Sequence, residues 1–290
     1  MPQILYPPAR AQTLREVLGT GAEIFRLTLG ATLPYGILVA LCTNLANLRN
    51  LSLDLPVQGV DSTDPVWWAW CVAGMILALW FGGALILRQK ALAAGERTSA
   101  AAEVRQAGAL LSRQIVCVGL SLVAVSLALT PVAMALPLAG LNPSLTNLAA
   151  VKPAMLLLLI PLSLPAAWLS LGLLFAPVAL VLRKLGPIEA MRHSFRLLRG
   201  NWWRTSLITG ILAVVLLGVT LLVWTVFLSV LQISGVKDAK LALTLLLPLS
   251  TVFSAISVPW CGAQALAMMG DLLVRQDEAR RSADGAGPGS

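Results

Sequence analysis

Three arginines with helical spacing offer the clearest chemistry in the sequence. At about 100° per residue, Arg192, Arg196 and Arg199 fall in one narrow arc of a short helix. Cations held near a membrane surface attract anionic lipid headgroups, each contributing roughly 1 kcal/mol. The arc therefore predicts contact with headgroups or with an acidic cytoplasmic partner. The same role is predicted for three neighbouring cations, Arg183, Lys184 and Arg204. Alternatively, all six cations only enforce topology and snorkel.

The helix that carries these arginines has sequence signals at both ends. Gly186 and Pro187 predict its start, because proline at the first helical position gives up no hydrogen bond. Gly200 predicts its end. The opposite face is mainly apolar and comprises Met191, Ser194, Phe195, Leu197 and Leu198. The pattern predicts an amphipathic helix that lies flat on a membrane, with Trp202 and Trp203 anchoring the next span at the interface.

Catalytic and metal-binding patterns are lacking. The only histidine, His193, has no second histidine or carboxylate cluster with which to share a metal ion. It lies on the polar face, one turn after Glu189, where we expect it to be solvated or to face the helix dipole; headgroup contact and pH sensing are the alternatives. No serine lies in a nucleophile elbow. The sequence therefore predicts no enzyme, no metal and no cofactor.

Composition identifies the class of protein. Of 290 residues, 58% are hydrophobic and 12% are charged, with a mean hydropathy of +0.83. These values are outside the range of soluble proteins and indicate an integral membrane protein. The net charge of +8 does not indicate nucleic acid binding, because the basic residues flank apolar runs and do not form one basic surface.

Six apolar runs are each long enough to cross a bilayer about 30 Å thick. The predicted fold is all-α, with six transmembrane helices and additional interfacial helices in one domain of residues 1–274, followed by a disordered cytoplasmic tail, 275–290. The predicted spans are about 27–48, 66–87, 114–138, 154–182, 205–233 and 242–269. Residues 1–10 are expected to be irregular. Interfacial helices are predicted at 12–26 and 99–111.

Charge sets the predicted orientation. Of the 21 Lys and Arg residues, 17 flank one side of the six spans and four flank the other. The positive-inside rule then places both termini and the segments 88–113 and 183–204 in the cytoplasm. A second set of interface anchors is predicted where span two begins, at Trp67, Trp68 and Trp70.

Charged residues are absent from the middle of every predicted span, although ion-coupled transporters commonly place them there. Asp271, at the inner end of span six, is expected to pair with Arg275 one turn later; a role in a proton relay is the alternative. Span four contains three prolines, Pro161, Pro165 and Pro177, which should kink it and free carbonyl groups.

The segment FAPVALVLRKLGPIEAMRHSFRLLRGNWWRTSLITGIL resembles a signature of six-span bacterial and archaeal membrane proteins. These are the YciC-like proteins and the membrane domain fused to some glycerophosphodiester phosphodiesterases. The pattern includes Gly-Pro, Glu189-Ala190, Ser194, Arg199-Gly200 and the tryptophan pair. Residues 259–275 are also similar, but Met269 precedes Asp271 by two positions where relatives often have a tyrosine before the aspartate. The resemblance implies a membrane domain and no reaction, because catalysis in the fused members resembles the work of a separate soluble barrel.

These observations lead to two functional hypotheses. The first is a non-enzymatic module of the bacterial inner membrane, with a structural, regulatory or lipid-interacting role. Its expected partners are the bilayer, including anionic headgroups, and a cytoplasmic or membrane protein, but not nucleic acid. The second is a permease or a lipid-handling conduit for a neutral or amphipathic solute, built around the kinked span four.

Overall fold

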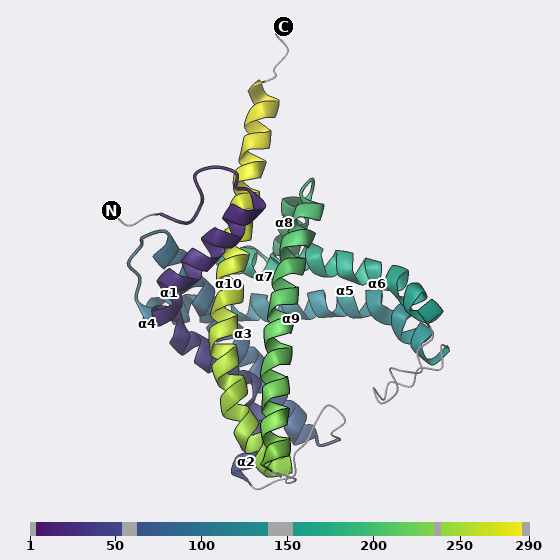
Figure 1. The fold of residues 1–290 in the computed structure, drawn as a ribbon. Coiled ribbons are helices and arrows are strands. Elements are labelled where there is room, and N and C mark those ends of the chain that lie inside the picture. The colour runs from purple at the N-terminus through teal and green to yellow at the C-terminus, as the bar shows by residue number, and fades with distance from the viewer. Residues whose placement is uncertain (1–3, 54–62, 139–152, 235–238, 286–290) are drawn as a thin grey trace. The chain divides into compact units, whose positions relative to one another are not determined.

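The computed structural model describes residues 4–53, 63–138, 153–234 and 239–285 (Figure 1). These residues contain helices and no strand, and six of the helical stretches are long and apolar enough to cross a membrane. The predicted all-α, six-span class is therefore confirmed. The candidate spans are Leu14–Thr43, Pro65–Ala93, Leu111–Ala135, Pro161–Arg183, Trp202–Ile233 and Thr244–Ser282.

The described chain forms two compact units, where the sequence suggested one domain. Residues 1–112 and 200–290 make unit 1, and residues 113–199 make unit 2. The helices of unit 1 are α1 (Leu14–Thr43), α2 (Leu45–Ser52), α3 (Pro65–Ala93), α4 (Ala100–Ala109), α9 (Trp202–Ile233) and α10 (Ala239–Gly285). Unit 2 contains most of α5 (Leu111–Leu138), together with α6 (Pro153–Leu173), α7 (Ala176–Arg183) and α8 (Pro187–Leu198).

The first span differs from its predicted bounds. The amphipathic lead is continuous with the span, and α1 begins at Leu14 behind a capping box formed by Thr13 and Glu16. It ends at Thr43, before the predicted 48. The physical reason lies at Asn44, whose side-chain amide donates to the Ala40 carbonyl at 2.9 Å while its backbone leaves the helical conformation.

Close packing of α1 against α3 and α10 builds the core of unit 1, and glycines permit it. A methyl group on Gly36 would lie 2.4 Å from the Ala255 carbonyl oxygen of α10. That carbonyl is the one that Pro259 cannot bond within its own helix. In the same way, a methyl group on Gly74 of α3 would lie 2.1 Å from the Cys42 carbonyl oxygen of α1. Backbones at such distances leave no room for a Cβ atom.

The last helix is longer than its span. A disordered tail was predicted for residues 275–290, but α10 continues to Gly285; residues 286–290 are outside the described residues. The extension has local support, since Arg275 pairs with Asp271 at i and i+4 and Ser282 donates to the Glu278 carbonyl. In addition, the Glu278 carboxylate accepts the Ala11 backbone N–H at 3.3 Å.

Span four is interrupted, as its prolines suggested. Helix α6 ends at Leu173 and α7 begins at Ala176, with Pro177 in its first turn. Pro177 has no N–H to bond the carbonyl of Leu173, so the helical bonding of α6 cannot continue, whereas α6 itself is continuous through Pro161 and Pro165. The polypeptide therefore makes a short turn at residues 174–175 inside this candidate span.

Candidate functional site

Helix α8 of unit 2 presents its arginines outward. Arg192, Arg196 and the C-cap residue Arg199 are exposed, whereas Ala190, Ser194 and Leu197 are buried. Exposed and buried side chains thus lie on different sides of α8. Two residues that were placed on the apolar face, Met191 and Phe195, are half-buried.

The ends of α8 lie at the predicted residues. Gly186 is the N-cap and Pro187 is the first helical residue. The helix ends at Leu198, and Gly200 follows with φ of +85°, a conformation that only glycine adopts without strain. This turn separates the basic helix from α9.

Two side chains attach α8 to the interrupted span. The Phe195 ring packs on Gly172 of α6, where a methyl group would lie 2.1 Å from the ring, and beside Trp168 with ring centroids 5.3 Å apart. The Ser194 hydroxyl oxygen accepts the Phe175 backbone N–H at 3.2 Å, in the turn between α6 and α7. Buried backbone groups require such partners. The break in span four therefore has its own side-chain cap, and this contact fixes which face of α8 is outward.

The outward face of α8 is slightly hollowed. Its lining combines two guanidinium groups with a carboxylate and two apolar side chains: Ile188, Glu189, Arg192, Phe195 and Arg196. The hollow is wide open to the surroundings. It could accept an anionic group against the arginines and a short apolar stretch against Phe195 and Ile188.

The other cations of the predicted set have different surroundings. Arg183 and Lys184 are exposed at the end of α7, where Lys184 adopts a left-handed conformation with φ of 55°. The Arg113 guanidinium donates to the Lys184 carbonyl at 3.2 Å, which caps this end of α7. Arg204 belongs to unit 1 and is engaged there.

His193 is not solvated, so that part of the expectation was wrong. Only 8% of the residue is exposed, and its Nε2 has no hydrogen-bond partner among the described residues. Burial, and then the positive charges of Arg183 and Arg196, lower the pKa of His193. A neutral imidazole follows from both effects. The hydrophobic pattern missed this because His193 lies at the edge between the two faces of α8.

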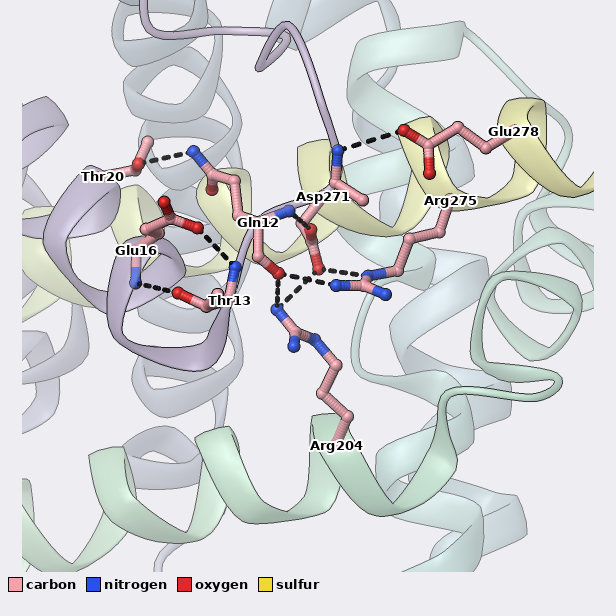
Figure 2. Close-up of polar contacts among 9 residues, drawn as sticks. Gln12, Thr13, Glu16, Thr20, Arg204, Asp271, Arg275 and Glu278 are labelled. Atoms are coloured by element: carbon pink, nitrogen blue, oxygen red, sulfur yellow. Dashed lines mark hydrogen bonds and ion pairs between the residues drawn. The ribbon is translucent and has the colours of Figure 1, made fainter.

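Arg204 lies in a half-buried polar cluster at the start of α9 (Figure 2). Its Nη2 is 3.1 Å from the Asp271 carboxylate, which is also bonded by Arg275 at 3.1 Å. The residue Asp271 is only 2% exposed. The predicted pairing of Asp271 with Arg275 is therefore confirmed. The second arginine was not predicted, because it comes from a distant part of the chain.

The backbone of Gln12 completes this cluster, which we call the Asp271 hub (Gln12, Arg204, Asp271 and Arg275). The Gln12 N–H donates to Asp271 Oδ1 at 2.7 Å. The Gln12 carbonyl accepts from Arg204 and from Arg275, at 2.6 Å in each case. One carboxylate and one carbonyl thus hold two guanidinium groups, and charge-assisted bonds of this kind are the strong ones.

A second buried carboxylate was missed altogether. Glu103 of α4 is 4% exposed and accepts hydrogen bonds from Tyr35 at 3.0 Å, from Arg88 at 3.1 Å and from Thr98. The expected helix at 99–111 is present as α4, and the Trp80 indole fixes it by donating to the Val104 carbonyl at 2.8 Å. Glu103 was not identified because an acid in the first turn of a helix is ordinary.

The predicted interface tryptophans divide into two groups. Trp203, Trp68 and Trp70 are 84%, 43% and 40% exposed, which suits rings that contact a membrane interface. Trp202 is half-buried. Trp67 is buried, with its ring centroid 4.9 Å from that of Trp68 in an edge-to-face arrangement, so it packs within unit 1.

The chain is similar to one protein family along most of its length. Residues 14–264 match the family model described as "Domain of unknown function (DUF7847)". The chain belongs to this family. No curated protein and no solved structure matches it. The matched range begins at the first residue of α1 and includes all of α8 and the base of α9. It ends before Asp271, so the family model covers only part of the Asp271 hub.

Proposed function

We propose that this chain is a non-enzymatic, lipid-interacting module of the bacterial inner membrane, and that α8 binds anionic headgroups on the cytoplasmic leaflet. The single observation that carries the proposal is the outward arc of Arg192, Arg196 and Arg199 on a helix whose other face is buried. Guanidinium groups recognise phosphate oxygens through paired hydrogen bonds.

The surroundings of the arc support a lipid as the ligand. Phe195 and Ile188 lie beside Arg192 and Arg196 in the same open hollow, so one surface offers both cationic and apolar contacts. Phospholipids present this combination at the boundary between headgroups and acyl chains. The positive-inside rule supports the cytoplasmic side for α8 and for both termini.

The rival proposal, a permease or a lipid-handling conduit, draws on one observation. Transporters often bind their substrates at interrupted transmembrane helices, and the candidate span 161–183 is interrupted between α6 and α7. The N–H of Phe175 in this break is, however, already bonded to Ser194. In unit 1, the hollow between α9 and α10 that is lined by Thr220, Trp224 and Phe253 holds only about 50 Å³. We therefore favour the lipid-interacting module.

The test measures lipid preference directly. Detergent-purified protein is titrated with phosphatidylglycerol or with phosphatidylethanolamine, and bound lipid is counted by native mass spectrometry. Changing Arg192, Arg196 and Arg199 to glutamine removes three cations worth together about 3 kcal/mol at most, roughly a hundredfold in affinity. We expect the preference for phosphatidylglycerol to fall at least tenfold.

A matched control removes the same charge elsewhere. Arg97, Arg105 and Arg280 are exposed and are not on α8, so their triple change to glutamine should leave most of the preference intact. An α8 variant that retains the wild-type preference would contradict the proposal. An acidic protein partner would then become the better reading of the same arc.

A further inference from the structure

The ten described residues before α1 are held against unit 1. Residues 4–13 have no helix, as was expected up to residue 10, but Leu5 and Tyr6 are only 8% and 7% exposed. Their backbone N–H groups both bond the Ala93 carbonyl, at 2.9 and 3.3 Å, and so cap the end of α3. We call residues 4–13 the N-terminal strap.

The strap crosses α10 at a glycine. A methyl group on Gly270 would lie 2.9 Å from the Pro8 ring and 3.2 Å from the Tyr6 ring. Any larger residue at position 270 would lift the strap. The neighbouring residue along α10 is Asp271, the centre of the hub, and one to two turns later Glu278 accepts the Ala11 N–H. Helix α10 therefore contacts the strap at three positions, Gly270, Asp271 and Glu278.

The same hub holds the base of α9. Among the described residues of α9, only Thr205 and Ile208 are buried, and both lie within about one turn of Arg204. The rest of this 32-residue helix is half-buried or exposed. The polar attachment of α9 within unit 1 is Arg204, which bonds both Asp271 and the strap at Gln12.

We propose that Asp271 is a latch that closes the N-terminal strap over the start of α9 and over residues 270–278 of α10, and that opening it releases the strap and the base of α9 together. The coupling follows from shared atoms. Asp271 Oδ1 holds the Gln12 N–H, and Oδ2 holds Arg204 and Arg275, while the Gln12 carbonyl bonds the same two arginines (Figure 2). Loss of the carboxylate charge weakens every member of the hub.

A native trypsin site reports on the strap. Arg10 is followed by Ala11, whose N–H is bonded to Glu278, so cleavage between them requires the strap to leave α10. The full chain in nanodiscs is digested briefly, and cleavage after Arg10 is followed by mass spectrometry. We expect Asp271→Asn to accelerate this cleavage at least tenfold over the wild type. Deuterium uptake at residues 202–210 should rise in the same variant.

Two further variants keep the test decisive. Asp277→Asn removes the same charge from an exposed position on the same helix and should cleave at the wild-type rate. Glu278→Ala removes only the Ala11 contact from an exposed side chain, leaves the hub intact, and should accelerate cleavage about threefold without changing uptake at residues 202–210. If Asp271→Asn and Glu278→Ala were both cleaved at the wild-type rate, the proposal that these residues hold the strap on α10 would be wrong. Faster cleavage in Asp271→Asn with unchanged uptake at residues 202–210 would overturn the coupling to α9.

Discussion

Six cations that look alike in the sequence have different surroundings in the structure. Arg192, Arg196 and Arg199 are exposed on α8, whereas Arg204 is bonded to Asp271 and to the Gln12 carbonyl. The difference arises because Asp271 is 67 positions away in sequence but adjacent in space. A guanidinium group that meets a buried carboxylate is held there by charge-assisted bonds. Arg204 is therefore better assigned to holding unit 1 together than to contacting headgroups.

His193 leads to a prediction about pH at the residue scale. Burial lowers its pKa in the folded protein, so the unfolded chain binds more protons between the folded pKa and the ordinary value. The contribution of the neutral imidazole to the free energy of unfolding is fully present above the ordinary pKa of histidine. It is lost as the pH falls toward the lower pKa of His193 in the folded protein. We expect the thermal unfolding midpoint in detergent to decrease between pH 7.5 and pH 5.5, and His193→Phe to reduce that decrease. An identical pH dependence in both proteins would contradict this account.

Helices α1 and α10 pack closely where a glycine of one helix lies opposite a carbonyl that a proline of the other helix leaves unbonded. Pro259 leaves the Ala255 carbonyl of α10 without its helical partner, and Gly36 lets α1 approach that carbonyl closely. Close contacts between Cα–H groups and carbonyls are common where helices pack through small residues. The helix α10 is continuous through both of its prolines, and at Pro259 the neighbouring helix α1 supplies such a contact.

Gly36 and Gly30 offer a matched test of this packing. Gly36→Ala would place a methyl group 2.4 Å from the Ala255 carbonyl oxygen, so helix α1 must shift. We expect a loss of about 1–3 kcal/mol, the usual cost of overpacking. Gly30→Ala, in the same helix with no atom within 4 Å, should be neutral or slightly stabilising. Thermal unfolding of the two variants in one detergent measures the difference, and equal midpoints would refute the argument.

For the whole molecule, the six candidate spans and the charge asymmetry lead to one proposed topology. Six crossings would place both termini on one side, and by the positive-inside rule the excess of Lys and Arg would make that side the cytoplasm. The described chain divides into two units, and α8 closes unit 2 while α9 returns to unit 1. The segment that joins them, around Gly200, lies on the proposed cytoplasmic face.

Reporter fusions test this topology. Alkaline phosphatase is active only outside the cytoplasm, so a fusion after Gly200 should be inactive and a fusion after Ser234, at the end of α9, should be active. A fluorescent protein at the C-terminus should fluoresce. Phosphatase activity at Gly200 would place α8 outside the cell and would remove the basis for its contact with inner-leaflet lipids.

The sequence by itself determined the fold class, the six spans, the helix 99–111, both ends of α8 and the outward arc of its arginines. These features depend on hydrophobic periodicity and on local capping by glycine and proline, which neighbouring residues fully encode. The resemblance to YciC-like proteins stays a prediction. Only the tertiary structure decided that the carboxylates of Glu103 and Asp271 are buried, that His193 is buried, and that the N-terminal strap lies on α10. Each of these features depends on contacts between residues that are far apart in the sequence. Local sequence patterns do not show which distant group a polar side chain contacts.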